Sequence, residues 1–579
     1  MKKISKEIKD FQRLFALGLD HQKKKKFKEA IDYYKKAIQK AEHSLKFYQD
    51  VDPSYSCAYN NLGNVFINLK KKKDAVDCFL KAIKINPKFA TAHFNLGNVF
   101  KGMEKHQEAV DLFKKAIEID PNFAQAQNNL GTTLNNMGKG NEAISYFKKA
   151  IQNNPNFIEA YNNLGNAMKV SGKPNEAINF FEKAIQINPK YTLAYNNLGN
   201  TYRHLLQQEK AISCFQKAIN IRPNFLTAHT NLASVYRELG KHQLALDCYA
   251  HAVNIDPNSP QANNNLGMLL LMLSDFDKGF EYYEWRKKIL THQDYSEYLK
   301  LNLTSKVWNG EDLNNKTILI LSEQGFGDIF EFARYLFILK KKYETKVIFR
   351  ARKKLVHLFK KNEFEVISET DPLPQHDYHC FLLSLPKIFF EKEKKLAKRI
   401  NYINVNEKII LKWKDKLSSI KGYKVGINWQ GDPKSDLSKL RSTPLNLFET
   451  FFSIENLNFI SLQKGAGSEQ IQNFKYRDRL YDFMSDADNK NAFEDTIGIL
   501  KNLDLVITSD TSLAHVSSTL GVKTWVVLPL SPHWTWFLNS DRSPWYENTK
   551  LYRQKDFNRW DSVFTTVKKD LINEYNIQK

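Results

Sequence analysis

The chain has 579 residues, of which 42% are hydrophobic and 26% charged, and it carries a formal net charge of +23. It is too long for one hydrophobic core, and no apolar run approaches the roughly 18 residues of a membrane helix, so we expect at least two domains and no membrane span. Five scattered cysteines without a CxxC pair, and an amino terminus without the apolar stretch of a signal peptide, favour a reducing, cytoplasmic location.

The positive charge is distributed along the chain. Only short clusters occur, such as Lys23–Lys26 and Lys70–Lys73, whereas nucleic-acid binding calls for a concentrated basic face. We therefore expect no nucleic-acid partner. A basic surface still favours acidic ligands, among them nucleoside diphosphates.

A 34-residue period runs through the first half of the chain. Gly and Pro return at this interval: Gly63, Gly97, Gly131, Gly165 and Gly199, and Pro87, Pro121, Pro155, Pro189, Pro223 and Pro257. A 34-residue unit with Leu-Gly, a later Ala, an aromatic residue and Pro is the signature of tetratricopeptide (TPR) repeats, which are stacked helical hairpins. About eight repeats, starting near residues 11, 56, 90, 124, 158, 192, 226 and 260, predict an α superhelix (a TPR solenoid) over 1–293 with a concave groove.

Within each repeat, we expect the aromatic residue to fill the gap between neighbouring units. The last repeat ends in the aromatic-rich segment Phe280–Arg286. This segment predicts a contact with the domain that follows.

Asparagine occupies the sixth position of seven repeats: Asn61, Asn95, Asn129, Asn163, Asn197, Asn231 and Asn265. Asparagine is a mediocre helix former, so its recurrence inside a helix asks for a cause. Its amide carries both donors and an acceptor, as needed to bind the backbone of an extended polypeptide. The alternative is that these amides bond between adjacent helices. We favour the peptide-binding ladder and keep the alternative open.

From about residue 294 the period disappears and strands alternate with helices. Buried strands are expected at 316–324, 347–351, 425–429, 459–462, 505–508 and 524–528, and one helix at about 329–341. This alternation predicts parallel sheets in two doubly wound, Rossmann-like halves over 294–579, at about 305–410 and 420–565. Ligands of such sheets bind at the carboxyl ends of the strands.

Three loops at such strand ends carry polar groups. The first, Gly325–Asp328 (GFGD), allows a tight turn at Gly325 and Gly327 and then places Asp328 at a helix start, where Asp could equally be an ordinary cap. The second, Asn428–Leu445, contains Gln430, Lys434, Lys439 and Arg441, or is simply a solvated loop.

The third loop, within Leu503–Pro529, brings Asp510, Thr511 and Ser512 to the start of a helix that carries His515. Hydroxyl groups and free N–H groups at a helix start form an anion site that suits a diphosphate. Asp510 could instead be only a cap, and His515 only a packed histidine. Asp486-Ala487-Asp488 resembles a metal-binding DxD motif, but no strand leads into it, so we expect a solvated loop and no metal site.

Several of these segments occur together in one family. WNGEDL (Trp308–Leu313), LSEQGFGDIFEFARYL (Leu321–Leu336), VGINWQGDP, SLQKG (Ser461–Gly465), DTSLAH (Asp510–His515) and the tail Ser531–Gln554 resemble the heptosyltransferase-like glycosyltransferases of family 9. They also resemble the bacterial members of that family that are fused to TPR repeats, which are similar to O-linked N-acetylglucosamine transferases.

The resemblance implies a GT-B fold and an inverting, metal-independent transferase without a cofactor, whose substrate is a nucleotide-sugar. It implies that Asp328 is the general base. Asp510, Thr511, Ser512 and His515 would hold the donor phosphates, with Gly325, Gly327, Gln430 and Lys464 also on the donor side. The family usually has a lysine that steadies the leaving diphosphate, and here Arg441 or Lys434 would have to serve.

The resulting hypothesis is a cytoplasmic glycosyltransferase whose repeats hold a polypeptide acceptor. Two alternatives remain at this point. In one, the acceptor is a glycan or a lipid-linked sugar. In the other, the chain is a non-catalytic TPR scaffold that retains the transferase fold.

Overall fold

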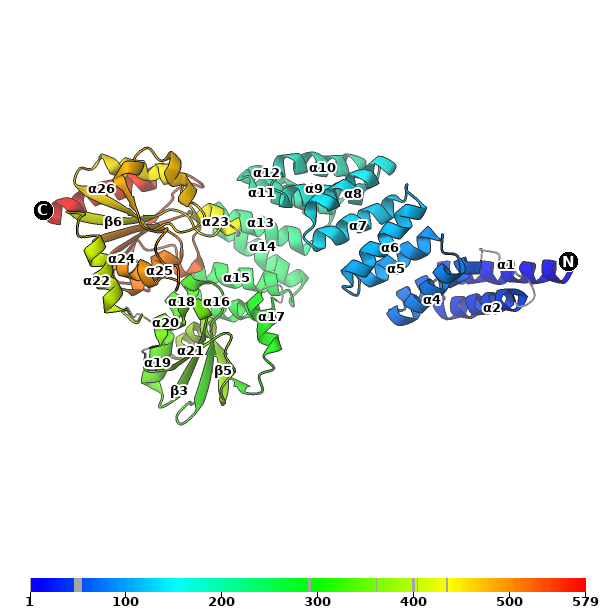
Figure 1. Ribbon diagram of the computed structural model, residues 1–579, viewed down its shortest axis with the longest axis horizontal. Coiled ribbons are helices and arrows are strands. Elements are labelled where there is room, and N and C mark those ends of the chain that lie inside the picture. Colours follow the sequence, from blue (N-terminus) through cyan, green and yellow to red (C-terminus); the bar gives the residue numbers. More distant parts are fainter. Residues whose placement is uncertain are drawn as a thin grey trace. The chain divides into compact units, whose positions relative to one another are not determined.

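The structure is a computed structural model that describes residues 2–45, 55–289, 293–360, 362–397, 401–403, 405–433 and 436–578. The chain divides into two compact units, Met1–Phe225 and Leu226–Lys579 (Figure 1). The last two helical hairpins therefore belong to the same unit as the sheets, although the repeat pattern ends only near residue 293. No helix within the described ranges is long and apolar enough to cross a membrane.

The first unit consists of consecutive helical hairpins, as the 34-residue period predicts. The two helices of each hairpin pack against each other, and the hairpins from α1–α2 to α9–α10 each pack against the one that follows. The helices are α1 (Lys2–Lys23), α2 (Phe27–Leu45), α3 (Ser56–Asn68), α4 (Lys72–Ile85), α5 (Ala90–Lys101), α6 (His106–Ile119), α7 (Ala124–Asn136), α8 (Gly140–Asn153), α9 (Ile158–Val170), α10 (Pro174–Ile187), α11 (Thr192–His204) and α12 (Gln208–Ile221).

The repeated glycine and the repeated aromatic residue pack against each other inside one hairpin. A Cβ atom at Gly165 on α9 would lie 2.7 Å from Cε1 of Phe181 on α10, and Phe181 is fully buried. The corresponding glycines of the other hairpins meet their own aromatic residue in the same way. The aromatic residue thus fills the hairpin itself, which is why glycine is needed there. It also packs toward the neighbouring unit, as predicted: Phe79 shares a buried cluster with Leu96 and Val99 of the next repeat.

The second unit begins with two further hairpins, α13 (Leu226–Glu238) with α14 (His242–Ile255), and α15 (Pro260–Met272) with α16 (Phe276–Tyr283). A short 3-10 helix (Glu284–Lys288) and α17 (Gln293–Lys300) follow. The predicted contact of the aromatic end with the next domain is confirmed. The ring centroids of Phe280 and Tyr283 lie 6.2 and 5.6 Å from that of Trp534, and these residues share one core with the first sheet.

The first sheet is parallel, in the order β1-β5-β2-β3-β4. Its strands are β1 (Lys306–Val307), β2 (Thr317–Leu321), β3 (Lys346–Ala351), β4 (Glu365–Ser368) and β5 (Tyr378–Phe381). Helices α18 (Phe326–Phe332), α19 (Arg334–Lys342), α20 (Val356–Phe359) and α21 (Leu385–Glu393) belong to this half. The single helix predicted at about 329–341 is divided at Ala333.

The second sheet is also parallel, in the order β11-β10-β9-β6-β7-β8. Its strands are β6 (Tyr423–Asn428), β7 (Leu457–Ser461), β8 (Leu480–Asp482), β9 (Leu505–Ser509), β10 (Thr524–Leu528) and β11 (Thr549–Arg553). Counted within this half, the order is 3-2-1-4-5-6, that of a doubly wound dinucleotide-binding sheet. The predicted pair of parallel α/β halves is thus observed, with β1, β4, β5, β8 and β11 as strands that were not predicted.

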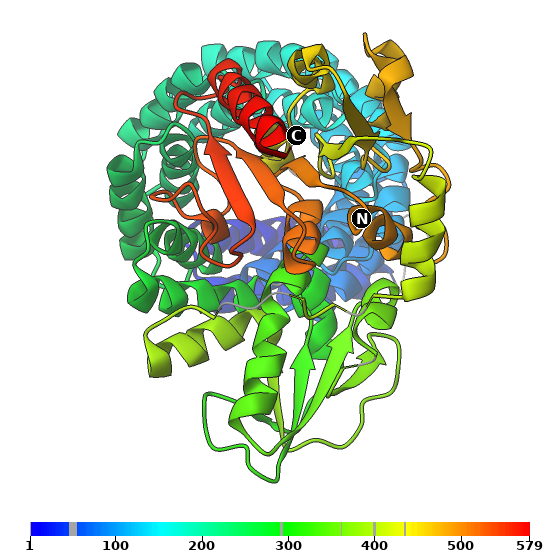
Figure 2. The same cartoon turned by 90° about the vertical axis from the view of Figure 1, so that its left-hand side faces the viewer.

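Helices cover both faces of the second sheet. The apolar face of α26 (Asp561–Gln578) packs on one side, in a core with Val425, Ile507 and Val527, and Figure 2 shows this helix in red over the sheet. The other side packs against α24 (Glu494–Leu500) and α25 (Ser512–Thr519). The remaining helices are α22 (Glu407–Lys416) and α23 (Asp436–Arg441). Because both faces are buried, only the strand ends and their loops are available to a ligand.

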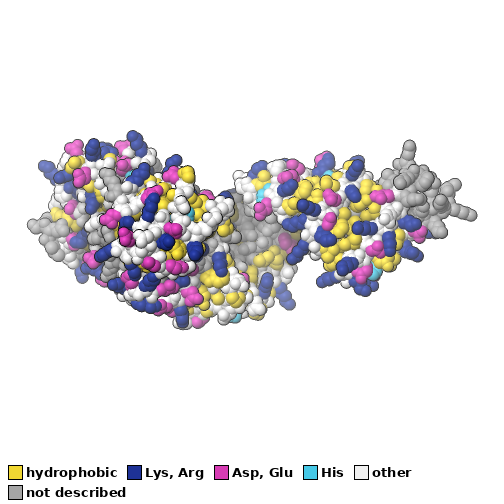
Figure 3. All heavy atoms as spheres, turned by 90° about the horizontal axis from the view of Figure 1, so that it is seen from below, with side chains coloured by type: hydrophobic (Ala, Val, Ile, Leu, Met, Phe, Trp, Pro, Cys, Tyr) yellow, Lys and Arg dark blue, Asp and Glu magenta, His cyan; other side chains and the backbone are white. Residues whose placement is uncertain are grey.

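Lysine and arginine side chains are spread among other side chains over the face drawn in Figure 3. Hydrophobic side chains gather on part of the first unit in the same view. The large hydrophobic residues that this unit exposes include Leu80, 49% exposed, and Val170, 76% exposed.

Candidate functional site

A cavity of about 510 Å³ opens at the carboxyl ends of β6, β7 and β9. Strands β6 and β9 are neighbours in space but not consecutive in the chain, which makes this the topological switch point of the second sheet, where the two connections diverge. The cavity is lined by Asn428 at the end of β6, Gln430 just beyond it, Lys464 after β7, and Thr511 and Ser512 at the start of α25. The sequence placed these loops at one sheet edge, and the structure brings them to one cavity.

Two buried amides hold the loops of the cavity together. Gln463 accepts hydrogen bonds through Oε1 from Asn428 Nδ2 (2.8 Å) and from the backbone N–H of Gln430 (2.9 Å). Asn428 Oδ1 in turn accepts from the hydroxyl groups of Thr508 and Thr511, each at 3.1 Å. Neither amide was predicted as a site residue. The only indication in the sequence is their position at or just beyond the end of a strand, where a buried amide needs hydrogen-bond partners.

The start of α25 faces the cavity with hydrogen-bond donors. Thr511 is the N-cap with an extended backbone, and Ser512 is the first helical residue, so the free N–H groups of the first turn point out of the helix there. Lysines 354, 464 and 490 also line the cavity. Lys464 Nζ donates to the carbonyl group of Ala487 and lies 3.4 Å from Asn489 Oδ1. Helix N–H groups and ammonium groups together attract an anion.

Asp510 does not line this cavity. Its carboxylate is 4% exposed as a side chain and accepts a hydrogen bond from Trp536 Nε1 at 2.8 Å. Arg441, the last residue of α23, places Nε 3.4 Å from Asp510 Oδ2. Burial by itself would raise the pKa of Asp510, but Arg441, the neighbouring histidines and the Trp536 hydrogen bond together outweigh it and hold that pKa below the usual value. Arg441 is therefore paired with Asp510, and Lys434 lies outside the described residues.

His515 is packed inside the protein. Its ring stacks on Trp536 with centroids 4.8 Å apart, and Nδ1 lies 3.3 Å from the Tyr546 hydroxyl group and 3.6 Å from Glu331 Oε2. Burial lowers the pKa of His515 to about 4, so the ring is neutral at pH 7. Burial also raises the pKa of Glu331 well above its usual value. The packed histidine that the sequence left open is the arrangement observed.

Asp328 caps the helix that begins at the carboxyl end of β2. Its Oδ2 accepts the backbone N–H of Gly325 at 3.0 Å, which agrees with the capping alternative. Burial raises the pKa of Asp328 to about 6, against the opposing effects of the Gly325 hydrogen bond and of Arg441. A Cβ atom at Gly327 would lie 3.2 Å from the His515 ring and 3.5 Å from the Ser512 backbone. Gly327 therefore allows α18 and α25 to pack closely.

The Asp486–Asp488 segment is not a solvated loop throughout. Asp488 accepts hydrogen bonds from the backbone N–H groups of Asp495 (2.7 Å) and Thr496 (3.1 Å), so it caps the first turn of α24. Asp486 is exposed. Among the described residues, no group of three or more His, Cys, Asp and Glu side chains could hold a metal ion.

The asparagines at position six form hydrogen bonds between successive repeats. Nδ2 of Asn95, Asn163 and Asn197 donates to an asparagine in the preceding repeat at 2.9, 3.0 and 2.8 Å. Asn129 donates to Asn98 at 2.7 Å, since Phe94 stands where Asn60, Asn128 and Asn162 stand in the neighbouring repeats. Asn61 receives a longer contact from Asn60 (3.4 Å), and Asn231 and Asn265 lie on α13 and α15. The alternative of bonding between adjacent helices is thus observed. All seven side chains are half-buried and keep some exposure.

Comparison with known proteins supports the repeats. Tetratricopeptide-repeat models match residues 11–44, 56–89, 90–123, 124–157, 156–224, 192–258 and 248–281. Protein FlbA of Caulobacter vibrioides is 22% identical over 320 residues, which cover 52% of this chain and 53% of FlbA. The chain therefore spans about half the length of this curated relative. Repeats of this kind suggest protein binding.

Two solved structures are similar in sequence to part of the chain. YrrB, described as a TPR protein with an unusual peptide-binding site, is 28% identical, covers 34% of this chain and 95% of its own, and has a TM-score of 0.28. MamA is 28% identical, with coverage of 30% and 95% and a TM-score of 0.26.

Proposed function

We propose that the protein is an inverting glycosyltransferase of GT-B type that moves a sugar from a nucleoside diphosphate sugar to a polypeptide held by the TPR repeats. The two parallel α/β halves of the second unit are then the two lobes of the transferase. The reaction type comes from the motifs that resemble those of family 9 glycosyltransferases, and the chemistry of the site supplies the residues.

The observation that carries this proposal is the cavity at the switch point of the second sheet. A doubly wound sheet binds its ligand at this point. The start of α25 and Lys354, Lys464 and Lys490 present positive charge to it. When the bond between the sugar and the diphosphate breaks, the electron pair stays on the diphosphate, and positive groups already in place stabilise the added charge.

Asp328 is the candidate for the general base. Its pKa of about 6, raised by burial, leaves it ionised at pH 7 while making it a stronger base than an exposed aspartate. In the proposed step its carboxylate takes the proton of the acceptor hydroxyl group as the oxygen attacks the anomeric carbon. The diphosphate leaves from the opposite side, so the configuration at the carbon inverts.

The acceptor is proposed to be a polypeptide because the repeats suggest protein binding. Four of the position-six asparagines, Asn95, Asn129, Asn163 and Asn197, each donate one N–H to the preceding repeat. An amide has a second N–H and an oxygen with two lone pairs, so each half-buried rung can still bond a peptide backbone. Because these side chains are already fixed by hydrogen bonds, they are preorganised for peptide binding.

One observation favours a non-catalytic scaffold as the second candidate. Asp510 and His515, which the family resemblance assigns to the donor phosphates, are engaged by Trp536 and Tyr546 instead. Phosphate binding then falls to Thr511, Ser512 and the lysines alone.

Titration calorimetry of the full chain with a panel of nucleoside diphosphates tests the proposal. We expect one nucleotide to bind, and Lys464→Met to weaken it about tenfold by removing an ammonium group from the cavity. Lys523→Met is the matched control, because Lys523 stands at the amino end of β10 and pairs with Glu574. If no nucleoside diphosphate binds the folded chain, the transferase proposal is wrong and the scaffold remains.

A further inference from the structure

A buried ion pair occupies the switch point of the first sheet. Glu323, at the carboxyl end of β2, is fully buried and accepts Arg286 Nη2 at 2.8 Å and Nε at 3.2 Å. The backbone N–H of Leu383, just after β5, donates to the same carboxylate at 3.0 Å. Strands β2 and β5 are the diverging neighbours of this sheet, so Arg286 fills the place where a doubly wound half would bind a ligand.

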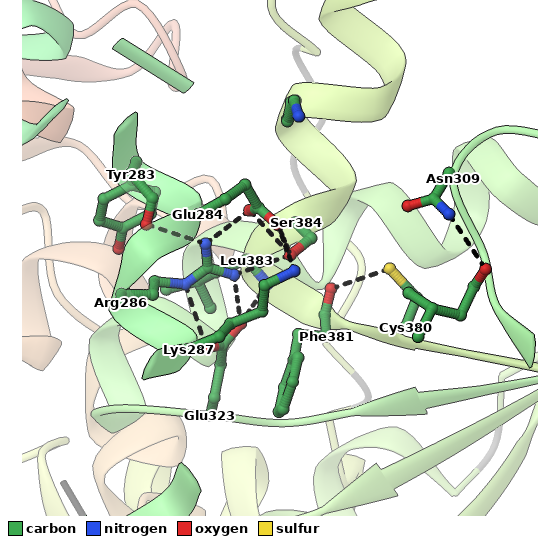
Figure 4. A network of polar contacts seen from close by, with 12 residues as sticks. Tyr283, Glu284, Arg286, Lys287, Asn309, Glu323, Cys380, Phe381, Leu383 and Ser384 are labelled. Atoms are coloured by element: carbon green, nitrogen blue, oxygen red, sulfur yellow. Dashed lines mark hydrogen bonds and ion pairs between the residues drawn. The ribbon is translucent and has the colours of Figure 1, made fainter. Parts of the chain in front are cut away.

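Arg286 comes from the segment that ends the repeats, and all its donors have partners. Besides Glu323, it donates to Glu284 Oε1 (2.6 Å), Ser384 Oγ (2.9 Å) and the carbonyl oxygen of Tyr283 (3.4 Å), as Figure 4 shows. It is only 1% exposed. Burying two charges costs free energy that apolar residues of the same size would avoid. The pair therefore suggests a need for fixed geometry at this point.

The residues after Glu323 lead directly to Asp328. Gln324 has a φ of +60°, a left-handed conformation that a non-glycine residue keeps only when its surroundings impose it. Its carbonyl group accepts Arg352 Nη2 at 3.3 Å, and its Nε2 donates to the Tyr283 hydroxyl group at 3.4 Å. The next residue donates its N–H to the Asp328 carboxylate. Arg286 and Tyr283 thus fix one end of the turn that Asp328 closes.

We infer that Arg286 is a positioning residue: by holding Glu323 it fixes the turn from β2 to α18 and so the place of the Asp328 carboxylate. The end of the repeat segment then determines the geometry of transfer. The catalytic part of this inference rests on the proposed function, whereas the positioning part does not.

The test compares Arg286→Met and Arg286→Lys with the matched control Lys287→Met in the full chain. Lys287 lies on the same 3-10 helix and pairs with Glu284 at 2.6 Å, and no contact joins it to Glu323 in the described structure. The readouts are hydrogen exchange of the peptide that covers 322–328, and kcat and donor KM per chain that binds nucleoside diphosphate. Counting only binding-competent chains removes the effect of partial unfolding.

We expect Arg286→Met to speed exchange in 322–328 at least tenfold. It should lower kcat about 10- to 100-fold, as a displacement of about 1 Å does. Donor KM should change less than kcat, because most residues that line the donor cavity, Lys464, Thr511 and Ser512 among them, belong to the second half. Arg286→Lys should be intermediate, since an ammonium group cannot reproduce the two-pronged contact. Lys287→Met should match the wild type in both readouts.

Unchanged exchange in 322–328 for Arg286→Met would overturn the inference whatever the activity. Faster exchange with an unchanged kcat would overturn its catalytic part. A wild-type chain that binds nucleotide but transfers no sugar would overturn the proposed function instead, and exchange alone would then decide whether Arg286 holds the turn.

Discussion

Replacing Asp328 by Asn is expected to make the protein more stable at neutral pH and less active. Burial raises the pKa of this carboxyl group from 3.8 to about 6. Above pH 6 the carboxyl group is ionised in both states, but ionisation is less favourable in the folded protein than in the unfolded chain. This difference lowers the free energy of unfolding, and Asn, which does not ionise, removes it. Below pH 3.8 the group is protonated in both states, so the advantage of Asn disappears.

The expected gain in the free energy of unfolding follows from the shift in the pKa of Asp328. About two pKa units correspond to about 3 kcal/mol at pH 8 and to about 1.6 kcal/mol at pH 5, where the folded state is already protonated. These are upper values, because the side chain is only half-buried and keeps part of its hydration. If the second unit, roughly 350 residues long, melts as one, the gain in Tm is about 4 °C at pH 8 and about 2 °C at pH 5.

Differential scanning calorimetry of the full chain at both pH values measures this, with Asp415→Asn as the control. Asp415 is exposed on α22, and its replacement should change Tm by less than about 1 °C. The burial argument would be refuted if Asp328→Asn did not raise Tm at pH 8, or if it raised Tm more at pH 5 than at pH 8. Sugar transfer should fall at least 10²-fold, and retained turnover would remove Asp328 as the base.

Three further predictions concern the repeats and the cavity. Gly165→Ala should lower the free energy of unfolding by about 1–3 kcal/mol, because its Cβ atom would meet Phe181 at 2.7 Å. The control Gly140→Ala, where the nearest atom to the new Cβ is 3.7 Å away, should be neutral or stabilising. Thermal melts measure both, and an equal loss of stability in the two variants would contradict the packing argument. Replacing Asn129, Asn163 and Asn197 together by Ala should weaken peptide binding at least tenfold, as measured by fluorescence anisotropy. It should also lower the free energy of unfolding by about 1 kcal/mol per lost hydrogen bond. An unchanged peptide affinity would leave these amides with a structural role only. Transfer should decline below pH 6 as Asp328 takes up a proton, and a pH–rate profile that is flat between pH 5 and 7 would count against that assignment.

Much of the site could be anticipated because it lies on regular elements. Strand β9 is fully buried and begins with the apolar run Leu505–Ile507. Its end and the start of α25 were therefore predictable, and with them Thr511 and Ser512 at the cavity. The direction of the side chains was not. Asp510 and Thr511 are adjacent, yet one turns to Trp536 and the other to Asn428, because partners from distant parts of the chain decide it.

The repeats and the alternation of strands and helices could be predicted from the amino-acid sequence. Both follow from local periodicity: a small residue and an aromatic residue return in every repeat, and apolar strands alternate with helices in the second half. The tertiary structure alone decided that the last two hairpins belong with the sheets, that asparagines such as Asn163 bond the preceding repeat, and that Arg286 meets Glu323. Each of these depends on side chains 35 or more residues apart, and no local pattern records which of many polar residues will meet.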